Sequence, residues 1–379
     1  MLDVMCRIEE DRLAFVADGI GAHTRRNELP SHAIAEMDPN EDNNPDRRVN
    51  AALPASFVGS RAYRAEHVAD ALALSTRFGP PQGMITVTTN PEWSELKEVL
   101  NSRAGQAATA VPQITARVFS QRLSKFMAKL KTIFAPLLYI IKVIEFQKRG
   151  LPHAHIVFAA DPKLPVTAID SVVSGEIPPE TEPRLRQLVL KFMVHPDDHV
   201  FRADGSVNER SRCQRDGRCV FGFPQPITAT THVNPDTHRV IYRRRTEADR
   251  MIATYSPALL LLWNGHCHVD IAMSAHTFVY MFKYISKGPD YAQYRIAPNR
   301  NNEASPEELA AAAANDYIYA RYLSASEAVW RIFGFDLTSK TPTVIRLAVH
   351  EPNQNRAQFR GSSNPGSSAS SLVRYFLRP

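Results

Sequence analysis

The stretch LYIIKVIEFQKRGLPHAHIVFA (residues 138–159) places two apolar, β-branched runs on either side of a short Gly-Leu-Pro turn. Runs of this kind predict two antiparallel strands joined as a hairpin. With the glycine at the centre of the turn, we expect Gln147 to lie opposite His153. Glu145 then lies opposite His155. Because alternate residues of a strand share a face, these four polar side chains should form one patch, with apolar residues on the other face.

This polar patch has the chemistry of a metal site. Two imidazoles with a carboxylate or an amide suit Mg²⁺, Mn²⁺ or a first-row transition metal and leave positions open for substrate oxygens. The third ligand is Glu145 or Gln147, and we favour Glu145 because a carboxylate is the harder, charged ligand. On spacing alone, a surface pair of histidines without a function is slightly favoured. A histidine-triad nucleotide hydrolase would need a third histidine where this chain has Val157.

Periodicity and capping signals predict the other elements. Helices are expected at residues 61–78, 93–103, 114–134, 182–195 and 275–287, and after the capping boxes SPEE (305–308) and SASE (324–327). Strands are expected at 84–89 and 266–273, with a hairpin at 231–242.

Composition is that of a soluble, intracellular protein. The 379 residues are 44% hydrophobic and carry a formal charge of +6, so an anionic partner is compatible but not required. Four cysteines are too few for a disulfide scaffold, the N-terminus lacks an apolar signal core, and the longest apolar runs are too short to span a bilayer. We expect no membrane partner.

A second candidate site lies in VYMFKYISKG (residues 279–288). Tyr280 and Tyr284 are four residues apart, as are Lys283 and Lys287, so each pair shares one face of a helix. Nearby cations and a metal-polarised phosphate would make a tyrosine a usable nucleophile. The alternative is an aromatic stripe that packs against a core.

Taken together, these segments resemble the replication-initiator region of Helitron transposases, which are HUH single-strand nucleases. The resemblance runs from about residue 53 to residue 359 and rests mainly on EFQKRGLPHAH followed by the two-tyrosine helix. It implies an α+β fold with an antiparallel sheet flanked by helices, an irregular insertion and a helical C-terminal part. Within its range the chain divides into residues 56–160, the first part of the nuclease core; 161–255, the insertion; 256–300, a strand and the tyrosine helix; and 301–361, a helical accessory region. Composition predicts that residues 1–55 are mostly disordered and that residues 362–379 form a linker.

The resemblance also implies an activity and the residues that carry it. A divalent metal (Mg²⁺ or Mn²⁺) would be held by His153 and His155 with Glu145 or Gln147. Tyr280 and Tyr284 would be the nucleophiles that nick single-stranded DNA and transfer a strand through a 5′-phosphotyrosine. The DNA backbone would be contacted by five cationic side chains: Arg243, Arg244, Arg245, Lys148 and Arg149. We would then expect a nuclear location in a eukaryotic cell. The alternative function is that of a transposon relic that binds DNA without cutting it.

Two departures from the family pattern matter. The family commonly has more cysteines near Cys213 and Cys219, the two candidate zinc ligands. In this chain one expected cysteine is replaced by Asp197 or Asp198, after His195, and another is replaced by Ala272. These changes count against a structural zinc, and Cys213-x5-Cys219 alone is a weak signal. Full Helitron proteins continue into a DNA helicase, which this chain lacks. The Walker-like string GFDLTSKT (residues 334–341) lacks its second glycine, so no use of ATP is expected.

Overall fold

The computed structural model describes residues 3–8, 11, 58, 61–101, 107–146, 150–211, 213–272, 291–295, 317–321, 323–345 and 347. The chain divides into two compact units, residues 1–341 and residues 342–379, and the elements below all belong to the first.

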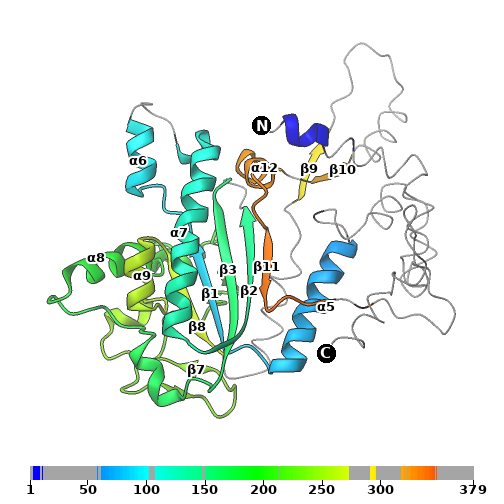
Figure 1. Cartoon of the computed structure of the whole chain (residues 1–379). Coiled ribbons are helices and arrows are strands. Elements are labelled where there is room, and N and C mark those ends of the chain that lie inside the picture. Colours follow the sequence, from blue (N-terminus) through cyan, green and yellow to red (C-terminus); the bar gives the residue numbers. More distant parts are fainter. Residues whose placement is uncertain are drawn as a thin grey trace, which may run out of the picture. The chain divides into compact units, whose positions relative to one another are not determined.

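A five-stranded sheet organises the larger unit (Figure 1). Its strands lie in the order β11 (Thr338–Thr341), β2 (Leu137–Phe146), β3 (Pro152–Ala160), β1 (Gly83–Thr88) and β8 (Cys267–Ile271). Every neighbouring pair is antiparallel. The expected α+β fold, an antiparallel sheet flanked by helices, is therefore confirmed.

The helices are α5 (Arg61–Phe78), α6 (Ser94–Asn101), α7 (Pro112–Ile133), α8 (Pro183–Phe192), α9 (Pro257–Trp263) and α12 (Ala325–Ile332). Short 3₁₀ segments are η2 (Ala108–Ala110), η3 (Val166–Ser171), η4 (Asp197–His199) and η5 (Ala248–Met251). Three small antiparallel pairs are β4 (Gln214–Arg215) with β5 (Arg218–Cys219), β6 (His232–Val233) with β7 (Val240–Ile241), and β9 (Tyr291–Arg295) with β10 (Tyr317–Arg321). Among the described helices, none combines the length and the apolar character that crossing a bilayer requires.

The core lies between one face of the sheet and the helices α7, α9 and α12, the last two of which pack against α7. Alternation along each strand supplies the apolar side chains of that face, such as Ile85 on β1 and Ile156 on β3, which are paired in register. Trp263, at the end of α9, packs edge-to-face on Phe119 and Phe126 of α7.

The opposite face of the sheet carries buried apolar side chains, such as Tyr139 and Ile141, where α5 contacts β2. Beside the turn between β2 and β3, the same face carries polar side chains, and this part is called the polar face below.

The β2–β3 hairpin forms as predicted, but its register differs from the expected one by two residues. Glu145 is paired with His153, and Val143 rather than Glu145 is paired with His155. The expected register put the glycine at the centre of the turn. The observed pairing moves the centre one residue earlier, and Gly150 then follows it with a φ of 77°, a left-handed conformation that glycine adopts without strain. Because the shift is two residues, Glu145 keeps its face of the sheet.

The C-terminal part of this unit differs from the helical region expected at 301–361. One helix there, α12, begins as predicted, with the Ser324 side chain accepting a hydrogen bond from the Glu327 amide. Tyr317–Arg321 and Thr338–Thr341, however, are strands, and the second of them completes the edge of the central sheet beside β2. β11 contains two threonines, whose branched side chains favour strands. The expected helices at 275–287 and after residue 305 lie outside the described residues, as does most of the segment 1–55.

Candidate metal centre

Three side chains meet on the polar face of the sheet, beside the turn that joins β2 to β3. Nε2 of His153 lies 3.1 Å from Nε2 of His155. Oε2 of Glu145 lies 3.2 Å from the first of these nitrogens and 3.7 Å from the second. All three residues are largely shielded from solvent, both histidines being buried. The sequence pattern predicts this set, but with Glu145 opposite His155 rather than His153.

These distances fit a shared metal ion. Ligand atoms that each lie about 2.1 Å from one ion are about 3.0 Å apart at a right angle and about 3.4 Å apart at a tetrahedral angle. The three observed separations fall at or near this range. Two imidazoles and one carboxylate on one side of an ion leave its other positions open for substrate oxygens or water. The donor set therefore suits a divalent metal.

Strand β1 supports this set from the side. Thr86 is in register with His155, and its Oγ1 lies 3.0 Å from the Nδ1 of that histidine. A hydrogen bond at Nδ1 fixes the orientation of the ring and leaves Nε2 to face Glu145 and His153, as is usual for metal-binding histidines.

The polar face continues onto β8 with two histidines that the sequence analysis did not select. His268 is in register with Thr86, and the carbonyl of His266 accepts a hydrogen bond from the amide of Thr88. The string GHCHVDI repeats the His-x-His pattern of β3, and that repeat was the signal available in the sequence. Only the sheet order β3-β1-β8 shows that both pairs lie on one face.

Both histidines, His266 just before β8 and His268 within it, are neutral at pH 7. Burial lowers the pKa of His266 to about 4, and the charges of His268 and His153 act in the same direction. Burial also lowers the pKa of His268, against the opposing charge of Asp270. Nε2 of His268 lies 3.2 Å from Oγ1 of Thr254. These rings thus add polar groups to the face without adding positive charge.

The arginine run at 243–245 has a different environment from the one expected. Arg244 is only 2% exposed, and its guanidinium donates to the carbonyls of Tyr242, Asp249 and Ile252. A phosphate backbone outside the protein cannot reach it, so the expectation that Arg244 contacts DNA is corrected. Arg243 and Arg245 both form ion pairs with Glu176, and they keep partial exposure.

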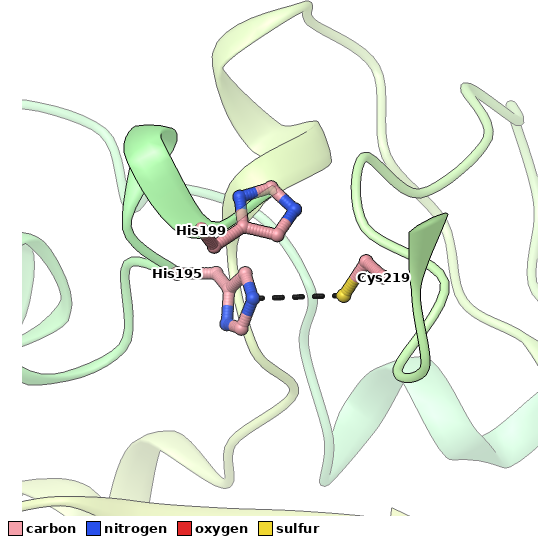
Figure 2. Close-up of side chains that lie close together, drawn as sticks. All are labelled: His195, His199 and Cys219. Atoms are coloured by element: carbon pink, nitrogen blue, oxygen red, sulfur yellow. Dashed lines mark hydrogen bonds between the residues drawn. The ribbon is translucent and has the colours of Figure 1, made fainter. Parts of the chain in front are cut away.

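Several predicted site residues lie outside the described residues. They are Gln147, Lys148, Arg149 and the four residues of the tyrosine helix: Tyr280, Lys283, Tyr284 and Lys287. Their roles stay predictions. Cys213 and Cys219 are described, and both lie beside His195 (Figure 2 shows Cys219).

Fold and site together define an α+β protein with a candidate divalent-metal centre on the polar face of its sheet. Residues 1–158 match the family described as the Helitron helicase-like domain at the N-terminus. The matched segment contains Glu145, His153 and His155, and it ends within β3. This match confirms the resemblance to the N-terminal region of Helitron proteins. No curated protein matches the chain.

Proposed function

We propose that this chain is a metal-dependent enzyme that nicks single-stranded DNA and transfers a strand, as in rolling-circle Helitron transposition. The observation that carries the proposal is the cluster of Glu145, His153 and His155, whose ligand atoms lie 3.1 to 3.7 Å apart within the segment that matches the Helitron family. Mg²⁺ or Mn²⁺ is the ion that a mixed imidazole and carboxylate set beside a phosphate would take.

The residues of the cluster would bind the metal ion, and a neighbouring side chain would orient one of its ligands. Glu145, His153 and His155 would hold the ion, and Thr86 would keep the ring of His155 in place. When bound, the ion supplies a Lewis acid for a phosphate oxygen. Thr86 and the neutral imidazole of His268 lie beside the cluster on the same face, so an anionic backbone would meet polar groups there besides the carboxylate of Glu145.

The nucleophile is proposed from the sequence. The phenol oxygen of Tyr280 or Tyr284 would form a bond to phosphorus while the bond from phosphorus to the 3′ oxygen breaks. The released 3′ oxygen takes up a proton, and the 5′ side stays on the protein as a phosphotyrosine. Strand transfer needs a second acceptor while the first tyrosine is occupied. A second tyrosine one helical turn away, about 5.4 Å along the axis, would provide it.

The metal centre is tested by removing its ligands. The purified chain is incubated with labelled single-stranded DNA and Mg²⁺ or Mn²⁺, and covalent adducts are resolved on denaturing gels. The double variant His153→Ala/His155→Ala should lose the adduct while retaining DNA binding, which depends on phosphate contacts elsewhere. Exposed His232→Ala is the matched control and should behave as the wild type. Undiminished adduct in the double variant would refute the proposed centre.

The third ligand is tested by a pair of single variants. Glu145→Ala should abolish the adduct and Gln147→Ala should leave it, because the carboxylate of Glu145 lies within 3.7 Å of both imidazole nitrogens. The opposite result would reverse this assignment.

The tyrosines are tested in the same assay. Tyr280→Phe and Tyr284→Phe should each retain some single cleavage and lose complete strand transfer, and the double variant should form no adduct. An adduct in the double variant would place the nucleophile elsewhere. A wild-type chain that binds single-stranded DNA in a salt-dependent manner but never forms the adduct would identify a non-catalytic relic.

A further inference from the structure

Four side chains of the type that bind zinc converge from two short segments far from the sheet's metal centre in sequence. His195 follows α8, and His199 ends η4. Cys213 directly precedes β4, and Cys219 ends β5. Figure 2 shows His195 and His199 side by side, with their rings packed edge-to-face and the sulfur of Cys219 facing the ring of His195.

The distances within this group are those of a metal site rather than of a hydrogen-bond pair. Nε2 of His195 lies 3.4 Å from Sγ of Cys213 and 3.7 Å from Sγ of Cys219. An imidazole nitrogen offers a single lone pair, so it cannot accept a full hydrogen bond from both thiols. Nitrogen and sulfur ligands on a tetrahedral zinc, at about 2.05 and 2.3 Å from it, are about 3.6 Å apart. Both observed distances lie close to that value.

His199 is oriented to complete the group. Its Nδ1 lies 2.6 Å from the carbonyl of Pro196, which can only accept a hydrogen bond, so Nδ1 carries the proton. Nε2 of His199 then holds the lone pair. It lies 3.4 Å from the carbonyl oxygen of Phe223, which cannot donate to it, and it would turn from that oxygen to an ion. A proton on Nδ1 held by a backbone carbonyl is the usual outer contact of a zinc-binding histidine. The ligand atoms of His195, His199 and Cys219 all lie within 4.8 Å of one another.

The backbone places the two cysteines independently of any metal. β4 and β5 form a two-residue hairpin whose turn is Asp216-Gly217, with φ values of 51° and 71°. Two positive φ values at an Asp-Gly pair are typical of a type I′ turn, whose twist matches that of the strands. The amide of Val220 donates to the carbonyl of Cys213, which closes the hairpin. Both sulfurs are therefore held near His195 by local structure.

We propose that His195, His199, Cys213 and Cys219 bind one structural Zn²⁺. His195, His199 and Cys219 already lie close enough together to hold the ion. Cys213 is the fourth ligand, and its Sγ, now 3.2 Å from Oγ of Ser211, turns from that hydroxyl to the ion. Four protein ligands close the coordination sphere, which is the mark of a structural rather than a catalytic zinc.

A zinc ion would stabilise a region that has little regular secondary structure. Residues 193–225 contain only short elements, and the ion would join the segment after α8 to the β4–β5 hairpin. The segment after α8 also pairs with residues 251–253. The His195 amide donates a hydrogen bond to the Met251 carbonyl, and the Ala253 amide donates one to the Met193 carbonyl. Thr254, next in sequence, contacts His268 on the polar face of the sheet. The zinc ion would thus hold in place residues 251–254, which contact β8 at His268.

The first test uses the full wild-type chain, expressed in zinc-supplemented medium, with any affinity tag removed. Elemental analysis after dialysis should give one zinc per chain, and a mercurial thiol reagent should release it to a chromogenic indicator. Chain refolded with Co²⁺ should show a thiolate-to-cobalt charge-transfer band and the intense visible absorption of tetrahedral cobalt. Less than a tenth of a zinc per chain together with no charge-transfer band would overturn the proposal. A Cys213–Cys219 disulfide in freshly purified protein would overturn it as well.

Variants separate this site from the sheet's metal centre. Cys219→Ser and His199→Ala should each lower the zinc content at least tenfold. The variant His153→Ala/His155→Ala should keep its zinc, and so should Cys6→Ser, which removes an exposed cysteine. Zinc retained in both Cys219→Ser and His199→Ala would refute the site. Because these readouts measure metal and not DNA cleavage, they can fail or succeed independently of the proposed nuclease activity.

Discussion

Replacing Arg244 should unfold the protein more readily rather than weaken its contact with DNA. The guanidinium is buried and donates to three carbonyls at 2.8, 3.2 and 3.4 Å. An ideal Cβ on Gly175 would lie 2.9 Å from its central carbon, so the cavity around it is tight. Burial lowers the pKa of Arg244, and the charges of Tyr242, Asp249 and Glu176 oppose that shift. The arginine is therefore a buried cation held by surrounding acceptors.

The expected loss can be worked out from these contacts. Each net hydrogen bond from a charged group contributes about 1.5 kcal/mol, and the bond at 3.4 Å contributes less because it is long, so the three together contribute about 4 kcal/mol. Removing one member of a buried charged group costs about 3 to 5 kcal/mol in other proteins, which agrees with this sum. Arg244→Met should therefore lower the free energy of unfolding by about 4 kcal/mol, a large part of the 5–15 kcal/mol typical of a folded domain. Arg244→Lys keeps the charge and should recover part of the loss.

Urea unfolding followed by tryptophan fluorescence measures this change. Arg245→Met is the matched control, because that side chain is 66% exposed and its partner Glu176 keeps a second ion pair with Arg243. It should leave the urea midpoint nearly unchanged. If Arg244 were a phosphate contact, Arg244→Lys would keep both stability and DNA affinity. A loss of less than about 1 kcal/mol in Arg244→Met, accompanied by weaker binding of single-stranded DNA, would refute the structural role.

Two further predictions concern the supports of the sheet. Thr86→Val should lower divalent-metal affinity by about 10- to 100-fold without unfolding the chain, because it removes the hydrogen bond to His155 Nδ1. Isothermal titration calorimetry with Mn²⁺ measures this affinity, and an unchanged value would show that Thr86 does not orient His155 for the metal. Asp70→Asn should lower the thermal unfolding midpoint, because Asp70 on α5 forms an ion pair with Lys340 on β11 and both side chains are largely buried. Asp70→Asn combined with Lys340→Met should unfold at a higher temperature than Asp70→Asn alone, and equal midpoints would show that the two residues are not coupled.

The local elements could be predicted because their signals are local. The helix at 61–78 and the hairpin around Gly150 follow from periodicity and turn residues, and both are observed. The register of the hairpin was missed by two residues, since a glycine with positive φ need not occupy the centre of a turn. β11 was missed because its pairing with β2 joins residues about 200 apart in sequence, and short polar strands carry little pattern of their own.

The arginine run illustrates a different limit. Consecutive arginines on a basic chain suggest a phosphate-binding strip, but strand alternation sends neighbouring side chains to opposite sides. Arg243 and Arg245 keep partial exposure and point to Glu176, while Arg244 points inward to backbone carbonyls. Composition cannot distinguish these environments. The position of Glu176 and the carbonyls around Arg244 depend on the tertiary fold.

The two His-x-His patterns show where sequence reasoning about the site ends. In β8, Cys267 and Val269 face the apolar core, so alternation sends His266 and His268 to the same face as the histidines of β3. The pattern thus assigns each pair to one side of its own strand. It cannot assign the two pairs to one site, because β8 reaches β3 only through β1, and more than 100 residues separate the two histidine strands. Thr86, in register with both His155 and His268, is the residue that joins the pairs into one polar face, and no signal in its own neighbourhood marks it for that position.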